Sequence, residues 1–81
     1  MIVKIQLEPP TYENGTWYAM HMKFNNKTNS YQYLESRDYW RYGPGHGEGK
    51  TKVQAIDDFK LKYEAWQDQK FHLELIDLEI L

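Results

Sequence analysis

The 81-residue chain contains no cysteine, which removes several classes of protein at the outset. Disulfide scaffolds, thiolate zinc sites and cysteine nucleophiles all require that side chain. A small chain without cysteine also suits a reducing compartment. We therefore expect a cytoplasmic protein.

Long apolar runs and a strong net charge are missing as well. No stretch approaches the roughly 20 apolar residues that span a bilayer, and the first residues alternate in polarity, unlike a signal peptide. A net charge of −2 provides no general attraction to nucleic acid or to anionic membranes. We expect no membrane partner, and binding of nucleic acid would need a local basic patch.

Aromatic residues are plentiful instead, at 16% of the chain. Each ring buries a large area, so a short chain can build a core from them without disulfides. The length fits a single folded unit, and we expect one domain over residues 1–81.

The first part of the chain has the pattern of a β-hairpin. Residues 2–8 and 17–24 each alternate between apolar and polar side chains, which is typical of half-buried strands. The Asn14-Gly15 pair between them is a strong turn signal. We predict an antiparallel pair of strands in which Met20 and Met22 face the core.

Residues 31–42 predict a third strand with aromatic side chains on both faces. Glycine at every second position over residues 43–49 predicts irregular structure there. Thr51 as the N-cap, with Gln54 three residues later, predicts a helix that ends near Gln69.

The C-terminal residues return to a strand pattern. Residues 71–80 alternate, but the phase slips by one residue at Leu75-Ile76, which predicts a β-bulge.

These elements predict an α+β fold in the order β-β-β-α-β. We expect a mainly antiparallel, three- or four-stranded sheet with one helix packed on one face. The other face is then open, which favours a homodimer or a protein partner there. The expected core comprises Val3, Ile5, Leu7, Met20, Met22, Ile56, Phe59, Tyr63, Trp66, Leu73 and Leu75.

The glycine segment suggests an anion site, although the phosphate-loop motif is absent. Gly49-Lys50-Thr51 opens a helix, but Pro44 stands where that motif needs its first glycine. A looser hypothesis is that Gly47, Gly49, Lys50 and Thr51 hold an anion through backbone N–H groups. The alternative, that the glycines only lead the chain into a capped helix, is the interpretation we favour.

Catalytic and metal-binding patterns are not recognisable. The three histidines have no ligand-like spacing, and no Ser-His-Asp or paired-carboxylate arrangement can be read. We expect no catalytic residue, no metal and no cofactor; His46 beside Glu48 is the one acid–base candidate kept open.

The segment from 37 to 42 interleaves aromatic and basic residues. Such a segment can stack single-stranded bases, form a protein–protein hot spot or simply pack on the sheet. Acidic neighbours weaken the nucleic-acid interpretation, and the acidic C-terminal strand is able to engage a basic groove as a mimic of nucleic-acid charge. The predicted partner-binding residues are Arg37, Tyr39, Trp40, Arg41, Tyr42, His46, Glu74, Asp77 and Glu79.

The run from Gly47 to Thr51, leading into Ala55-Ile56 and Phe59, resembles the HicB-like antitoxin domain. The resemblance implies a sheet-and-helix fold and a toxin-neutralising role. The chain departs from that family in its tyrosine- and tryptophan-rich strand and in having no DNA-binding helix-turn-helix extension. In general character it is also similar to phage-encoded inhibitors such as anti-CRISPR proteins.

We therefore expect a non-enzymatic binding or inhibitor protein that occupies a surface of a larger protein or nucleoprotein complex. The alternative is a single-stranded nucleic-acid-binding module that uses residues 37–42.

Overall fold

The alternating N-terminal residues form a β-hairpin in the computed structural model, which describes residues 2–13, 15–35, 38, 43–69 and 75–81. Strand β1 (Ile2–Glu8) pairs antiparallel with β2 (Trp17–Asn25), with Ile5 opposite His21. The turn between them is closed by the Gly15 N–H, which donates to the Tyr12 carbonyl at 3.1 Å. The predicted hairpin is confirmed.

Strand β2 is the centre of a five-stranded sheet. It pairs antiparallel with β3 (Ser30–Tyr33) and with β4 (His46–Gly49). The His21 N–H donates to the Gly45 carbonyl and the His21 carbonyl accepts from the Leu34 N–H. Both backbone groups of one strand residue point to the same edge, so β3 and β4 follow one another along one edge of β2.

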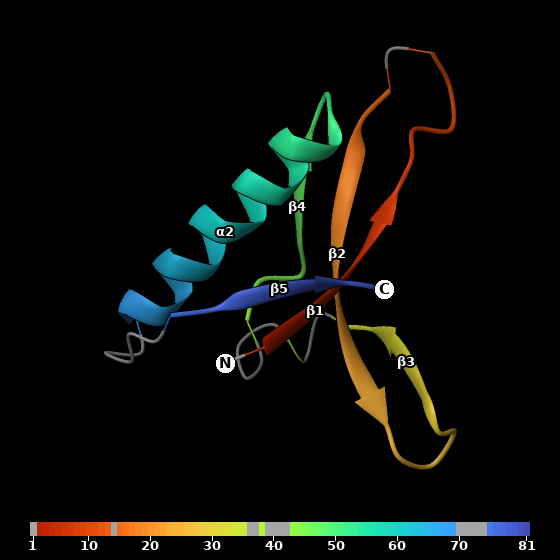
Figure 1. The fold of residues 1–81 in the computed structure, drawn as a ribbon, viewed down its shortest axis with the longest axis vertical. Coiled ribbons are helices and arrows are strands. Elements are labelled where there is room, and N and C mark those ends of the chain that lie inside the picture. Colours follow the sequence, from red (N-terminus) through yellow and green to blue (C-terminus); the bar gives the residue numbers. More distant parts are fainter. Residues whose placement is uncertain (1, 14, 36–37, 39–42, 70–74) are drawn as a thin grey trace.

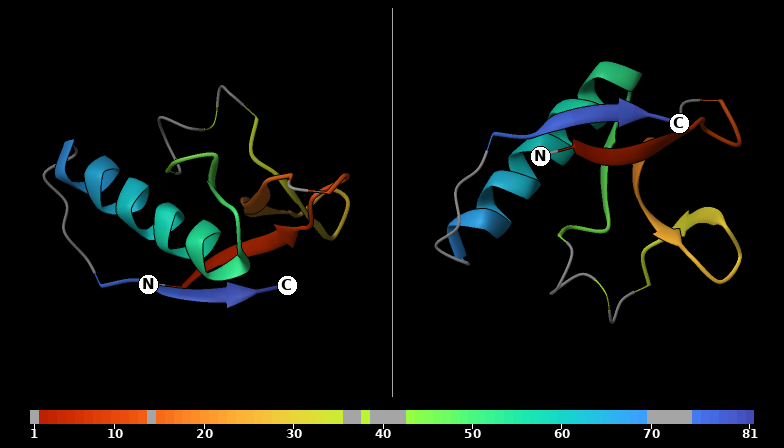
Figure 2. Two further views of the ribbon diagram at one scale, coloured as in Figure 1. Left: turned by 90° about the horizontal axis from the view of Figure 1, so that it is seen from above. Right: turned by 60° about the horizontal axis from the view of Figure 1, so that its bottom comes forward.

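The chain returns to the sheet through the helix α2 (Lys52–Gln69) and the strand β5 (Asp77–Ile80), which pairs parallel with β1. Both β4 and β5 run in the direction of β1, so the connection between them crosses over one face of the sheet. Figures 1 and 2 show α2 along that side. The predicted α+β class, with one helix packed on one face of a mainly antiparallel sheet, is confirmed.

The helix begins where the capping pattern predicts. The Thr51 side-chain oxygen accepts from the Gln54 N–H at 3.1 Å, and the Gln54 side-chain oxygen accepts from the Lys50 N–H at 2.8 Å. Two backbone donors at the start of the helix are thereby satisfied.

The core lies between α2 and the sheet, on what we call the covered face. Its buried members are two aliphatic residues of β1, one alanine of β2 and a column of helix residues spaced four apart. They are Val3, Ile5, Ala19, Ala55, Phe59 and Tyr63, with Leu7, Trp17, Ile56, Trp66, Ile76 and Leu78 packed against them.

Small residues let the helix approach the sheet closely. Gly47 lies opposite Ala19 in the β2–β4 ladder, and a Cβ atom at Gly47 would overlap the Ala55 carbonyl and the Phe59 N–H. Glycine and alanine at this position therefore set the distance between α2 and the strands.

His21 ties the segment before β4 to the core. Its ring lies edge-on to Phe59, with centroids 5.5 Å apart, and its Nδ1 lies 3.0 Å from the Pro44 carbonyl. Gly43 has a φ of 130°, and a Cβ there would crowd both the His21 and the Tyr63 rings. The left-handed glycine allows the chain to pass this closely.

The predicted phase of β2 was wrong. The prediction placed Met20 and Met22 on the covered face, whereas that face carries Ala19 and His21, and both methionines lie on the opposite side. Met22 is still buried, although it lies on the side of the sheet away from the helix. Ala19 lies opposite Gly47, where α2 approaches the sheet closely, so volume rather than hydrophobicity decides the residue at that position.

Other boundaries also differ from the prediction. The strand predicted over 31–42 ends at Tyr33, and the glycine segment predicted as irregular contains β4. The bulge predicted at Leu75-Ile76 is absent because both residues precede β5, and Leu75 is 95% exposed rather than buried. Leu73, predicted in the core, lies outside the described residues.

Candidate functional site

The sheet surface opposite α2 is the candidate site, and we call it the open face. Side chains alternate along a strand and directly paired residues share a face, so the neighbours of the core residues point to this side. Among the described residues, no α-helix covers it. Its members are Ile2, Lys4, Gln6, Glu8, Tyr18, Met20, Met22, Phe24, Tyr31, Tyr33, His46, Glu48, Asp77 and Glu79.

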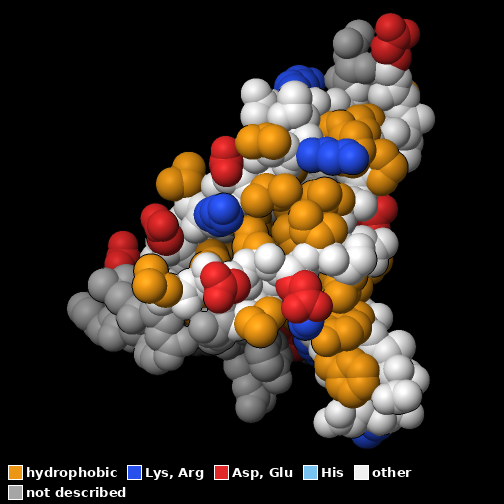
Figure 3. Space-filling model, in the orientation of Figure 1, with side chains coloured by type: hydrophobic (Ala, Val, Ile, Leu, Met, Phe, Trp, Pro, Cys, Tyr) orange, Lys and Arg blue, Asp and Glu red, His pale blue; other side chains and the backbone are white. Residues whose placement is uncertain are grey.

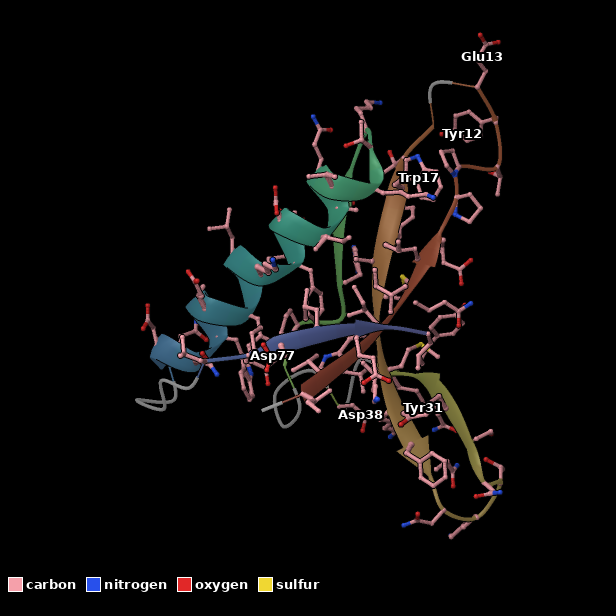
Figure 4. The ribbon with its side chains drawn as sticks, viewed as in Figure 1. Tyr12, Glu13, Trp17, Tyr31, Asp38 and Asp77 are labelled. Carbon is pink, nitrogen blue, oxygen red and sulfur yellow. The ribbon has the colours of Figure 1, made fainter. Side chains whose placement is uncertain are left out.

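Exposed aromatic rings extend along β2 and β3. Tyr18, Phe24, Tyr31 and Tyr33 each leave between 37% and 47% of their surface in solvent. Phe24 and Tyr31 are paired across the ladder in an edge-on arrangement, with centroids 5.2 Å apart. Figure 3 shows apolar side chains gathered on the arm that these two strands form, and Figure 4 labels Tyr31 on this arm.

A second edge-on contact extends this surface to β4. The Tyr18 ring lies 5.5 Å from the His46 ring, and His46 Nε2 is 3.8 Å from the Glu48 carboxylate. The aromatic surface therefore spans three strands, β2, β3 and β4.

Carboxylates lie on the neighbouring strands of the open face. The described part of the open face carries four, on Glu8, Glu48, Asp77 and Glu79, against a single lysine, Lys4. Lys4 pairs with Glu79, and its Nζ lies 6.0 Å from the Tyr31 ring centroid. The hydrogen bond to Glu79 raises the pKa of Lys4 above its ordinary value. The surface is aromatic with an acidic margin.

Glu8 is held by two neutral donors. Its Oε1 accepts from the Gln6 side-chain amide at 3.1 Å and from the Tyr33 hydroxyl. The Tyr33–Glu8 hydrogen bond is the main cause of a raised Tyr33 pKa, because the carboxylate favours the protonated phenol. Tyr33 therefore keeps its proton at neutral pH.

Three predicted partner-binding residues share the open face, on strands at opposite edges of the sheet. His46 lies in β4, and Asp77 and Glu79 lie in β5. The other predicted members, Arg37, Tyr39, Trp40, Arg41, Tyr42 and Glu74, lie outside the described residues. The sequence interpretation missed Tyr18, Phe24, Tyr31 and Tyr33, although the alternation of apolar residues over 17–24 already placed Tyr18 and Phe24 on one face.

The predicted anion-binding residues lie at the junction of β4 and α2. Gly47 and Gly49 face the helix in β4, where they permit close packing. The Lys50 and Gln54 N–H groups are satisfied by the capping side chains, and the Glu48 N–H donates to the Asp58 carboxylate at 2.8 Å. That backbone donor, followed by Lys62, lowers the pKa of Asp58. Side chains of the protein itself thus accept hydrogen bonds from three of the backbone donors at this junction, those of Glu48, Lys50 and Gln54.

Metal, membrane and family signals give no further assignment. Over the described ranges, no three histidine, aspartate or glutamate side chains converge in a manner that could hold a metal ion. Within the same ranges, no helix combines the length and apolar content needed to cross a bilayer. Comparisons of the chain with protein-family models, curated proteins and solved structures give no significant match.

Proposed function

We propose that the chain is a non-enzymatic binding protein whose open face docks on a basic, partly apolar surface of a larger protein. It acts by occupying that surface, in the manner of an antitoxin or a phage-type inhibitor. The observation that carries the proposal is the set of four exposed rings on β2 and β3 within an acidic margin.

Tyrosine is well suited to this role. It presents a large apolar ring at low entropic cost and keeps a hydroxyl for hydrogen bonding, which explains its frequency in protein interfaces. Tyr18, Tyr31 and Tyr33 meet this description, and Phe24 adds an apolar centre.

The charge of the open face selects the partner. Four carboxylates and one lysine repel phosphate and attract arginine and lysine. A basic protein surface, including one that normally binds nucleic acid, is the complementary partner.

Site-specific photo-cross-linking in the cells that produce the protein tests the location of the interface. A benzoylphenylalanine at Tyr31 is expected to cross-link to a different protein, whereas the same probe at Leu61, an exposed residue of α2, is expected to give no such product. Equal products from both positions would contradict the proposal. A product containing two copies of this chain would identify a homodimer instead.

Matched double variants then test the energetics with the cross-linked partner. Phe24→Ser with Tyr31→Ser is expected to weaken binding by about 30-fold or more, as interface hot spots do. Val53→Ser with Leu61→Ser removes a similar apolar surface from the exposed side of α2 and is expected to leave binding unchanged. The reverse ranking would place the interface on the helix.

Single-stranded nucleic acid is the second candidate, because exposed rings on a sheet can stack bases. The carboxylates of the open face oppose it. Fluorescence titration with short oligonucleotides at two salt concentrations separates the candidates, since binding that weakens steeply with salt would favour nucleic acid.

A further inference from the structure

A small cavity lies where the hairpin connection meets the open face. It has a volume of about 260 Å³ and is lined by Glu8, Pro9, Thr11, Tyr12, Thr16 and Tyr18. Glu8 and Tyr18 are directly paired between β1 and β2, so both side chains point to the open face. The cavity therefore extends the candidate interface toward the connection that carries Tyr12 (Figure 4).

The cavity contains a carboxylate that no cation neutralises within the described part of the chain. The donors to Glu8 are the Gln6 amide and the Tyr33 hydroxyl, and both reach Oε1. The ion pairs of the described residues join other groups: Lys4 with Glu79, Lys23 with Asp38, Lys62 with Asp58, and His46 with Glu48. Oε2 of Glu8 is left for a ligand.

The residues that line the cavity favour a cation that can also stack on an aromatic ring. Glu8 repels an anion, and an apolar group would leave the carboxylate without a counter-charge. The rings of Tyr12 and Tyr18 attract a cation through their faces, and the Thr11 and Thr16 hydroxyls supply acceptors. A guanidinium is planar, carries five donors and stacks on aromatic rings, so it can satisfy all three kinds of group at once.

We propose that this cavity binds the guanidinium of an arginine side chain on the partner protein. The proposal rests on the proposed function and names the anchor contact of that interface. Arginine buried in an aromatic pocket is typical of the residues that dominate interface energetics.

Titration of the ¹⁵N-labelled protein with the capped peptide acetyl-Gly-Arg-Gly-amide tests the site directly. Amide shifts at Gly15, Thr16 and Tyr18 are expected to saturate with a Kd on the order of 1 mM, as suits a single side chain. The same peptide with citrulline, which keeps the shape and loses the charge, is expected to produce no saturable shift. Equal shifts from both peptides would overturn the proposal.

Two glutamate variants provide the matched comparison. Glu8→Gln is expected to weaken arginine-peptide binding by about tenfold, because a charge-assisted contact is lost. Glu13→Gln removes the same charge from the nearby exposed tip of the connection, outside the lining, and is expected to change the Kd less than about twofold. Equal weakening by both variants would reduce the effect to general attraction and overturn the site.

A third variant tests the ring without altering charge. Tyr12→Leu is expected to weaken the peptide several-fold while the far-ultraviolet circular dichroism is retained, because Tyr12 is 73% exposed. Undiminished affinity in Tyr12→Leu would remove the stacking role. Free L-arginine is expected to bind more weakly than the capped peptide, and tighter binding would assign the cavity to a small molecule instead.

The two proposals fail in different ways. If the arginine peptide does not bind but Phe24→Ser with Tyr31→Ser abolishes partner binding, the cavity assignment is wrong and the open-face interface stands. If the peptide binds in the cavity but the double variant binds the partner normally, the proposed function is wrong.

Discussion

The two faces of the sheet use opposite kinds of side chain. On the covered face, β2 and β4 present small residues at Ala19 and Gly47, where α2 comes closest, and the helix adds Phe59 and Tyr63 to the core. On the open face the strands themselves carry the large rings, and most of those rings end in a hydroxyl. A close approach between a helix and a sheet requires small residues at the point of closest contact, whereas an exposed surface that contacts a partner gains from large amphipathic ones.

The strongest test of this comparison is to replace one phenylalanine on each face with alanine. Phe59→Ala is expected to cost about 3–5 kcal/mol in the free energy of unfolding, because it leaves a cavity in the core. Phe24→Ala is expected to cost about 1 kcal/mol or less, because Phe24 is already 47% exposed. Urea denaturation followed by circular dichroism measures both values. Similar losses would mean that the open face is as tightly packed as the core.

The second prediction concerns the narrow space beneath α2. Gly47→Val is expected to cost about 2–3 kcal/mol, because its side chain would overlap the helix backbone at Ala55 and Phe59. The control is Glu48→Val, which introduces the same side chain at the next residue of β4, on the open face. If both variants have the same unfolding midpoint, the spacing between helix and sheet is not set by Gly47.

The covered face also predicts a pH dependence through His21. Burial lowers the pKa of His21 below 6.5, although the Pro44 carbonyl acts in the opposite direction. The unfolded state then binds more protons than the folded state between that lowered pKa and 6.5. Stability is complete above about pH 7.5 and falls as the pH drops through 6.5, with a maximum slope of about 1.4 kcal/mol per pH unit.

Unfolding free energies measured between pH 8 and pH 5 check this slope. His21→Gln is the matched variant, and it is expected to flatten the profile over this range while His46 and His72 remain. A wild-type profile without a slope between pH 7 and pH 5.5 would show that the folded protein accepts the proton readily, and that His21 is not enclosed as described. The lowered pKa of Asp58 does not affect this range, because the stability that it provides is lost only as the pH falls to about 4 and below.

The sequence predicted the elements better than it predicted their faces. The cap at Thr51, the four-residue spacing of Phe59 and Tyr63 and the Asn14-Gly15 turn are local signals, and the structure contains the helix and the hairpin that they predict. The face of β2 cannot be read locally, because Tyr18 and Ala19 both fit a strand and only the nearness of α2 decides which of them it covers. Hydrophobicity favoured the methionine side, whereas the available volume favoured Ala19.

The parts of the candidate site that depend on local sequence patterns were also predictable. Asp77 and Glu79 alternate with apolar residues, so their exposure follows from the strand pattern, and His46 was identified beside Glu48. The cavity at Glu8 was not predictable, because it depends on the pairing of Glu8 with Tyr18 and on the course of the connection between them. Long-range pairing of this kind leaves no local signal in the sequence.

The smallest expected changes in stability come from removing one hydroxyl at the start of α2 and one on the open face. Thr51→Val keeps the side-chain shape and removes the oxygen that accepts the Gln54 N–H, so it is expected to cost about 1 kcal/mol. Tyr33→Phe removes the donor to Glu8 on the exposed surface, where water replaces it, and is expected to change stability by less than about 0.5 kcal/mol.

Thermal unfolding of the two variants beside the wild type measures this difference, and ultraviolet titration adds an independent check. Tyr33→Phe is expected to remove one phenol that titrates later than an ordinary tyrosine, since the Glu8 hydrogen bond raises the pKa of Tyr33. A Tyr33→Phe variant that is destabilised more than Thr51→Val would mean that the Tyr33–Glu8 contact helps to hold the fold together. The open face would then be part of the protein's folded framework as well as a surface for a partner.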